Sequence, residues 1–376
     1  MNTVSNTISN IRGKKTEIVR KNRYCVVSKD DSQKIYCFTT PVFDKESGKL
    51  VQDVFVQGNK CYEFHGSDGL VKIHQDSIHF LRNSEIIEIH FSAKQEFSLL
   101  NNGKLLKSKE FLIYPTFNGV LVKELIVGKQ KSLLKVIDRS GRPSKCNSKY
   151  FALMKGKFEP TFTLNAMYAE DKYSRVFYNT TLFFKKQADT AYQLELNTSE
   201  SANRVVYEMN LYEPKLIQDT TVESRRPKEN NVYGSIAFLG KSPDCGTQFL
   251  YSRIDMPKVW NIKNSIFESI KLYVPYYMES GNHFQLFTPF KRYCSFGANW
   301  TNKIQSSDIH IKSSIQNGFL VFDLSPHLLT KTGHLKENEG IVVKPNAINE
   351  SFSIVSTADN YFTPQILEFK LKNKEK

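Results

Sequence analysis

Short apolar segments separated by polar turns recur along most of this 376-residue chain. Residues 86–91 (IIEIHF) alternate apolar and polar side chains after the first position, which is the pattern of a half-solvated strand. Comparable strand-like segments occur at 36–43, 49–56, 111–114, 133–137, 158–167, 176–184, 192–196, 205–212 and 319–324. No segment between 130 and 212 shows a long 3.6-residue period, so the pattern predicts an all-β fold.

Three Asn-Gly dipeptides predict tight turns of β-hairpins, because both residue types accept the positive φ that such turns need. They are Asn102-Gly103, Asn118-Gly119 and Asn317-Gly318. Strand-like segments flank the first two, and one follows the third.

A polar stretch at residues 219–234 separates two runs of strand-like segments. A chain of this length exceeds one ordinary core, so we expect two or three domains. We predict tandem antiparallel β-sandwich domains of jelly-roll type, one at 24–212 and one at 213–376. An internal boundary near 107 or near 145 would divide the first region into two small β domains.

Composition supports the β prediction, and the net charge indicates which kind of partner the chain favours. Aromatic residues make up 12% of the chain, with 27 Phe and 18 Tyr, and they suit pleated, half-buried surfaces. The net charge of +14 favours anionic partners such as nucleic acid, acidic glycans or acidic protein surfaces, although charge also keeps a protein soluble. Residues 1–23 hold six basic residues against one acid, which predicts a flexible basic arm or, alternatively, a docking tail for an anionic surface.

The cysteines and the N-terminus bear on the compartment. Six cysteines are dispersed without CxxC spacing, which favours reduced core residues over three disulfides. The N-terminus has no apolar signal-peptide core, and no apolar run approaches the roughly 20 residues that span a bilayer. We therefore expect no membrane insertion and no secretory signal peptide.

Several weak motifs follow one another from about residue 213. Asp219-Thr-Thr-Val222 comes first, then Pro227 and the turn 231–234 with Asn231 and Gly234. Arg253 and Asp255 follow in one segment, then 266–274, Asn299-Trp300-Thr-Asn302, Asp323 within 321–325, and the segments 340–344, 352–358 and 364–369. In order and approximate spacing, residues 213–372 resemble the DNRLRE domain family, a β-sandwich module of bacterial and archaeal surface proteins.

The resemblance implies a sandwich and an interaction role. Members of the family are mostly non-catalytic modules, and some relatives resemble carbohydrate binders. The resemblance is to modules of multi-domain surface proteins of Gram-positive bacteria. It implies a structural role for six residues: Asp219, Asn231, Gly234, Arg253, Asp255 and Asp323. The turn at 231–234 has one residue more than the family pattern, and Asn299 stands where the family has Thr.

Candidate chemistry is sparse. The eight histidines are scattered, and a regular strand would place His74 and His79 on opposite faces. No metal motif, nucleophile elbow or phosphate loop is present, so we predict no catalytic residue, no metal site and no cofactor. Two alternatives remain open: an unrecognised carboxylate pair, and a Ca²⁺ site built from Asp219, Asn230, Asn231 and Asp359-Asn360.

The segment 287–293 interleaves aromatic and basic side chains ahead of Trp300. Trp300 is predicted either to stack on a sugar ring or to anchor the core, and Arg253 to pair with a carboxylate such as Asp219 or Asp323. The predicted binding residues are Trp300, Tyr293, Arg292 and Lys291.

Two functions follow. The first is a non-catalytic structural or interaction protein of a bacterial cell surface, spore coat or phage particle, whose partners are other protein subunits. The second is a protein that binds an anionic glycan through its C-terminal sandwich. Nucleic acid ranks below both kinds of partner.

Overall fold

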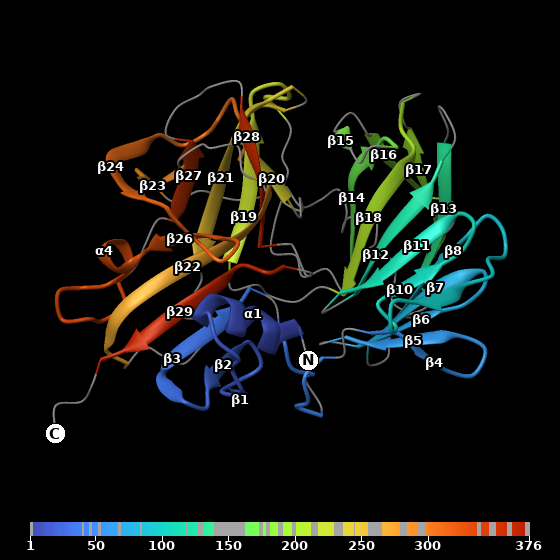
Figure 1. The fold of residues 1–376 in the computed structure, drawn as a ribbon. Helices are drawn as coiled ribbons and strands as arrows, with labels where there is room; N and C mark the ends of the chain where they lie inside the picture. Colours follow the sequence, from blue (N-terminus) through green and yellow to red (C-terminus); the bar gives the residue numbers. More distant parts are fainter. Residues whose placement is uncertain are drawn as a thin grey trace. The chain divides into compact units, whose positions relative to one another are not determined.

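A computed structural model shows two units built of antiparallel β-sheets (Figure 1). It describes residues 3–39, 41–44, 47–51, 54–66, 69–82, 85–116, 119–126, 131–138, 162–172, 176–177, 181–186, 191–197, 201–211, 217–228, 236–243, 245–254, 265–278, 284–291, 298–336, 340–345, 351–358 and 363–372. Unit 1 consists of Met1–Val42 and Pro214–Lys376, and unit 2 of Phe43–Glu213. The all-β prediction is confirmed, and the first 42 residues belong with the C-terminal part of the chain.

The N-terminal segment is not the flexible arm that its charge suggested. Helix α1 (Thr3–Arg12) buries Val4, Ile8 and Ile11, whose spacing of four and three residues places them on one helical face. Strand β1 (Ile18–Arg20) pairs with β2 (Cys25–Ser28), and β2 pairs with β3 (Asp31–Phe38). Three buried side chains at helical spacing therefore outweigh the basic charge of this segment.

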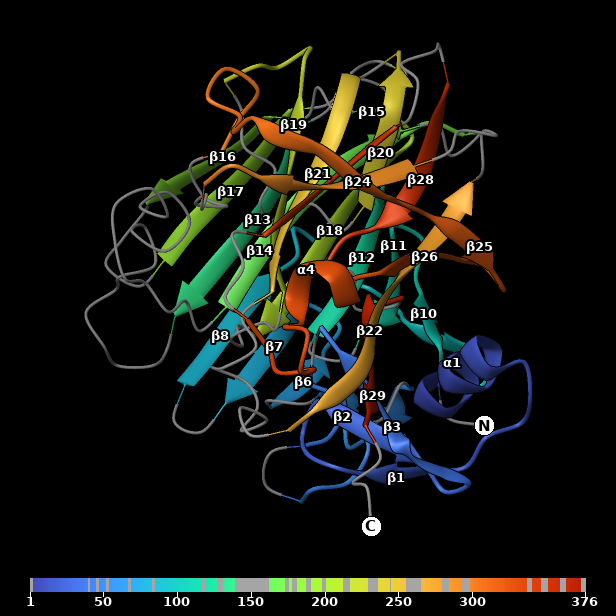
Figure 2. The same ribbon diagram turned by 90° about the vertical axis from the view of Figure 1, so that its left-hand side faces the viewer.

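The first sheet of unit 1 combines strands from both ends of the chain. Strand β3 pairs with β29 (Ile366–Leu371), and β29 pairs with β22 (Phe267–Met278), as Figures 1 and 2 show. The hairpin of β25 (Ser314–Gln316) and β26 (Phe319–Asp323) extends this sheet beyond β22. Asn317 and Gly318 turn the hairpin with φ of 48° and 85°, as predicted for an Asn-Gly turn.

The second sheet of unit 1 packs on the first. Its described order is β28 (Phe352–Ser356), β20 (Ile236–Ser242), β21 (Gly246–Ile254), β27 (Ile341–Pro345), β23 (Phe284–Pro289) and β24 (Ser306–Lys312), with β19 (Ile217–Glu223) also on β21. The end of β22 pairs with β28 and joins the two sheets. Leu272 and Leu367 of the first sheet share one buried cluster with Leu239, Leu250 and Val343 of the second, which is the core of a sandwich. The short helix α4 (Ser325–Leu328) follows β26.

Unit 2 also contains two antiparallel sheets. One has the described order β16 (Thr181–Lys186), β17 (Ala191–Asn197), β13 (Lys131–Asp138), β8 (Glu85–His90), β7 (Ser77–Arg82), β6 (Leu70–Ile73), β5 (Tyr62–His65) and β4 (Val56–Gln57). The other has β15 (Val176–Phe177), β14 (Phe162–Glu170), β18 (Arg204–Leu211), β12 (Gly119–Leu125), β11 (Phe111–Pro115), β10 (Leu105–Lys107) and β9 (Ser98–Leu100).

Strand pairing in unit 2 crosses both positions at which an internal boundary was considered. Strand β13 pairs with β8 across residue 107 and with β17 across residue 145. Residues 43–213 accordingly form one unit rather than two small domains. Asn102 and Gly103 have positive φ in the turn between β9 and β10, whereas Asn118 lies outside the described residues. Within the described part of the chain, no helix is long and apolar enough to cross a bilayer.

Candidate functional site

A row of polar side chains crosses the first sheet of unit 1 on the face turned away from the core. Tyr36 of β3 lies opposite Glu368 of β29, and Glu368 lies opposite Lys271 of β22. Side chains alternate between the faces of a sheet, so Lys34 and Tyr273, two residues away from members of the row, share its face. Their chain neighbours point into the hydrophobic cluster instead.

The C-terminal end of α1 is fixed next to this row. The last carbonyls of a helix have no partner within the helix and need one from elsewhere. The side-chain amide of Gln316 donates to the Ile11 carbonyl at 2.9 Å, and that of Asn317 donates to the Asn10 carbonyl at 2.8 Å. The β25–β26 turn therefore positions the end of the helix, where Arg12 is located.

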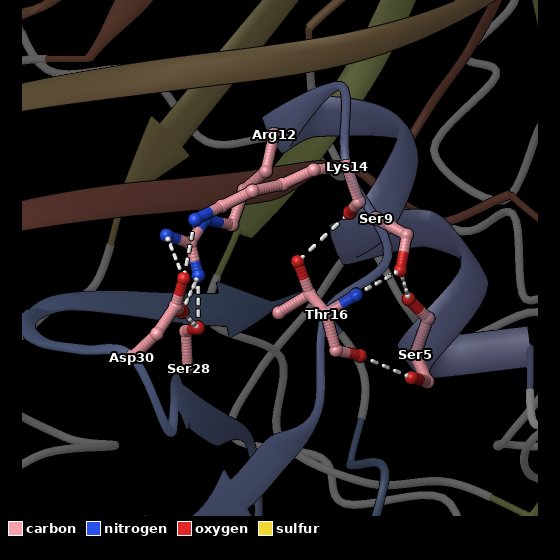
Figure 3. Close-up of polar contacts among 7 residues, drawn as sticks. All are labelled: Ser5, Ser9, Arg12, Lys14, Thr16, Ser28 and Asp30. Carbon is pink, nitrogen blue, oxygen red and sulfur yellow. Dashed lines mark hydrogen bonds and ion pairs between the residues drawn. The ribbon is translucent and has the colours of Figure 1, made fainter.

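The chain beyond α1 folds back on the helix through a small hydroxyl network (Figure 3). Ser5 Oγ donates to the Thr16 carbonyl at 2.8 Å, and the Thr16 amide donates to Ser9 Oγ at 3.0 Å. Thr16 Oγ1 donates to the Lys14 carbonyl at 3.0 Å. These bonds hold Lys14 close to Arg12.

Arg12 and Lys14 converge on Asp30, in the turn between β2 and β3 (Figure 3). Arg12 donates to both carboxylate oxygens of Asp30, with Nη2 at 3.1 Å from Oδ2, and to Ser28 Oγ. Hydrogen bonds from Arg12 and then from Lys14 hold the pKa of the Asp30 carboxyl well below its usual range. Asp30 therefore remains an anion that orients both cations.

These groups surround a cavity of about 270 Å³. It is lined by Ile11, Arg12, Lys14, Lys34, Tyr36, Lys271, Tyr273, Gln316 and Glu368. Four of these side chains are cations, and two carboxylates, Asp30 and Glu368, lie within 4 Å of three of them. Four positive charges less two negative charges leave a net charge of +2 around the cavity.

Two tyrosine hydroxyls add hydrogen-bond donors. Tyr273 donates to Glu368 Oε2 at 3.3 Å, and Lys34 Nζ lies 3.9 Å from Glu368 Oε1. The Tyr36 hydroxyl is buried and finds no aligned hydrogen-bond partner among the described residues. Burial first, and the nearby Glu368 carboxylate second, raise the pKa of both phenols, so both remain protonated donors at neutral pH. Glu368 is close enough to act on the Tyr36 hydroxyl but makes no well-aligned bond with it, so a better-aligned acceptor oxygen of a ligand would improve the hydrogen bonding of this buried donor.

Of the binding residues predicted from the sequence, neither Trp300 nor Lys291 lines this cavity. The ring of Trp300 lies 5.3 Å from that of Phe249, and Lys303 Nζ is 4.1 Å from the Trp300 ring centroid. Trp300 is half-buried against a small cluster in the second sheet, which is the arrangement of a core anchor. Lys291 is exposed, and Arg292 and Tyr293 lie outside the described residues.

The positions marked by the family resemblance are spread over unit 1. Asp219 is buried and accepts a hydrogen bond from the Ala358 amide at 2.6 Å, which ties β19 to the segment after β28. Arg253 is half-buried on β21, and Asp323 accepts hydrogen bonds from the Ser325 amide at 3.0 Å and hydroxyl at 2.5 Å. Three of these positions lie outside the described residues: Asn231, Gly234 and Asp255. The same holds for the candidate Ca²⁺ ligands Asn230, Asp359 and Asn360.

The histidines of unit 2 correct a second expectation. His74 and His79 do not point apart: their ring centroids are 4.3 Å from each other, and His79 is 6.4 Å from His90. The reason is that residues 74–77 turn the β6–β7 hairpin, with the His74 amide donating to the Ser77 carbonyl at 2.8 Å. Five residues that include a turn cannot be counted along one strand.

This histidine cluster does not have the order of a Ser-His-Asp catalytic triad. Ser77 Oγ lies 2.9 Å from His79 Nε2 and donates to Asp76 at 3.0 Å, so Ser77 stands between the histidine and the carboxylate. In a catalytic triad the histidine stands between the other two, and the serine must reach the substrate, whereas Ser77 is only 2% exposed. Among the described residues, no group of three or more His, Cys, Asp or Glu side chains could hold a metal ion.

Cys25, Cys37, Cys61 and Cys245 are buried, as predicted for core residues, and form no disulfide in this structure. Cys25 and Cys37 lie directly opposite each other on β2 and β3. Cys146 and Cys294 lie outside the described residues.

No protein-family model matches this chain, and no curated protein matches it. The cavity of unit 1 is the feature of the described residues that best fits a ligand. The sequence does contain a signal for it: Lys-x-Tyr occurs at 34–36 and at 271–273, which places a cation and a phenol on one face of each strand.

Proposed function

We propose that this chain is a non-catalytic binding protein that recognises an anionic group of a glycan through the cavity of unit 1. The observation that carries the proposal is the Tyr36 hydroxyl, a buried donor without an aligned acceptor, beside a net charge of +2. Charged oxygen acceptors form the strongest hydrogen bonds with such donors.

The size of the cavity supports a small charged group rather than a whole oligosaccharide. Typical ligand sites have volumes of roughly 300–1,000 Å³, and this one has about 270 Å³. An acidic substituent with part of its sugar ring fits such a space. The rest of a glycan would extend over the surface of unit 1.

Titration calorimetry with acidic and neutral monosaccharides at low ionic strength tests the proposal. Lys271→Ala removes a cation that lines the cavity, and we expect it to weaken the binding of acidic sugars. Lys312→Ala is the matched control, because Lys312 is an exposed lysine of β24 outside the cavity. Equal binding of neutral and acidic sugars, or equal losses in both variants, would refute the proposal.

We propose a structural role in a bacterial surface layer, spore coat or phage particle as the second candidate. It is favoured by β9, the last strand in the described order of its sheet, which exposes Leu99 (39%) and Leu100 (38%). A sheet edge with exposed leucines suits pairing with another protein chain. Sedimentation velocity over a range of concentrations tests it: self-association should disappear in Leu99→Lys, and a wild-type protein that remains monomeric would count against it.

We also propose that residues 213–372 form a DNRLRE-type module. The hydrogen bond between Asp219 and Ala358 supports this assignment, because it connects the first and one of the last segments that carry the resemblance. Within such a module Asp219 serves the fold, while the cavity depends on residues from both ends of the chain. Asp219→Asn is expected to lower stability without removing a cation of the cavity. Loss of anion binding in a fully folded Asp219→Asn protein would contradict this division of roles.

A further inference from the structure

We propose that the cavity of unit 1 selects a phosphate monoester over singly charged acidic groups. This inference rests on the proposed function and names the chemical class of its anion. Carboxylates and sulfate esters carry one negative charge, whereas a phosphate monoester carries about 1.5 to 2 at pH 7. The question is therefore which of these charges the cavity matches.

The charge balance favours a dianion. Arg12, Lys14, Lys34 and Lys271 surround the cavity, and Asp30 and Glu368 offset two of their charges. Two further carboxylates lie nearby: Asp31 acts on Arg12 and Tyr36, and Asp323 of β26 lies opposite Lys271. Neither forms an ion pair with a cation of the cavity among the described residues, so the balance of +2 counts only the carboxylates within 4 Å of those cations. A singly charged ligand would leave one positive charge unmatched in a partly enclosed site, while a phosphate monoester would match both.

The distribution of donors also fits a phosphate group. Arg12 and Lys14 already donate to Asp30, so they supply a positive field rather than new hydrogen bonds. Three other donors remain. Lys271 makes no hydrogen bond or ion pair in the described part of the chain, Lys34 has only a 3.9 Å contact with Glu368, and Tyr36 has no aligned acceptor.

These three donors come from two strands and share one sheet face. Lys34 and Tyr36 are two residues apart on β3, and Lys271 is one strand beyond Glu368, which lies between Tyr36 and Lys271. A phosphate monoester presents three terminal oxygens, each a strong acceptor. A carboxylate presents two oxygens that can each accept two hydrogen bonds, so three donors would have to share them. A sulfate ester also presents three oxygens, so its charge alone separates it from the phosphate ester.

Glucose 6-phosphate and glucose 6-sulfate form a matched pair for the test, because they share a shape and differ in charge. Glucuronate adds a carboxylate, and inorganic phosphate separates recognition of the free anion from recognition of the ester. We expect calorimetry at pH 7.5 and low salt to show about tenfold tighter binding of the phosphate ester than of the sulfate ester. Weaker binding of inorganic phosphate than of glucose 6-phosphate would show that the sugar contributes.

Two variants separate charge from hydrogen bonding. Lys271→Met removes a charge but keeps an unbranched side chain, so it should lower the phosphate-to-sulfate ratio towards one. Tyr36→Phe removes only a hydroxyl, so it should weaken both ligands while leaving their ratio unchanged. Circular dichroism and thermal melting confirm that each variant is folded.

The failure of this inference is distinguishable from that of the proposed function. Binding of the sulfate ester or glucuronate as tightly as the phosphate ester would overturn the dianion preference and leave an anion site. An unchanged ratio in a folded Lys271→Met protein would overturn it as well. No binding of any of the four compounds would overturn the proposed function together with the inference.

Discussion

Cys25 and Cys37 allow a quantitative prediction about the hairpin that carries part of the cavity. They form a directly opposed pair on β2 and β3, and the Phe38 amide donates to the Tyr24 carbonyl at 3.0 Å. The neighbouring pair is thus hydrogen-bonded, which makes Cys25 and Cys37 a non-hydrogen-bonded pair with Cα atoms about 4.5 Å apart. A disulfide needs roughly 4.4–6.8 Å, so we predict that these thiols form a disulfide on oxidation.

Oxidised glutathione is a suitable oxidant. One cysteine thiolate would attack the glutathione disulfide and release one glutathione, and the second cysteine would then resolve the mixed disulfide and release another. Burial first, and the adjacent Cys25 second, raise the pKa of the Cys37 thiol, so the reaction should be slow at neutral pH and faster at alkaline pH.

The expected gain follows from the length of the closed loop. Linking residues 25 and 37 closes a loop of about 13 residues, for which the loss of unfolded-state entropy amounts to about 3 kcal/mol at 25 °C. Strain in the native state would reduce this figure, so we expect the free energy of unfolding of unit 1 to rise by about 1–3 kcal/mol.

Intact mass spectrometry, peptide mapping and urea unfolding measure the outcome. The oxidised protein should weigh two hydrogens less and yield one peptide pair that contains Cys25 and Cys37. Cys25→Ser is the control, since it retains Cys37 but cannot form the bond. Failure to form this link at alkaline pH, or an equal stability change in the treated control, would refute the reasoning.

Three further predictions concern other parts of the chain. Burial first, and the neighbouring His74 second, lower the pKa of His79, so the unfolded chain binds more protons than the folded one. Unit 2 should therefore lose stability as the pH falls through about 6.5. Urea unfolding at pH 7.5 and 5.5 should show this loss, and His79→Gln should reduce it. Ile8→Ala should cost about 2–5 kcal/mol of unfolding free energy if α1 is packed, against almost nothing for a flexible arm. Glu223 is fully buried and accepts from Arg226, so Glu223→Ala should cost about 3–5 kcal/mol in thermal or urea unfolding, and a loss below 1 kcal/mol would contradict this pairing.

Local pattern predicted the strands well because alternation is a property of neighbouring residues. The segment 86–91 alternates and forms most of β8, and Asn317-Gly318 turns a hairpin with the expected positive φ. The helix at the N-terminus was equally local, with Val4, Ile8 and Ile11 at helical spacing. The basic charge that favours a flexible arm lies mostly after the helix, at residues 14–23, and does not bear on the three apolar positions of the helix.

The cavity could not be predicted in the same way. Each Lys-x-Tyr segment is visible in the sequence, but Tyr36 and Glu368 are paired only because β3 joins β29. No periodicity within a strand specifies which distant strand will lie beside it. The histidine pair failed for the opposite reason, because a turn between His74 and His79 interrupted the strand along which faces were counted.

The pairing of β3 with β29 also determines when unit 1 can be completed during synthesis. At about 5–20 residues per second, the roughly 330 residues between Tyr36 and Glu368 take on the order of 15–65 s to emerge. Unit 2 is synthesised entirely within that interval. Meanwhile β3 is paired with β2 on one edge only, and Ile35 and Cys37 lack the strands that later cover them. The open edge of β3 is then available to the β29 of another chain, so exchanged dimers would form between chains made on neighbouring ribosomes of one message.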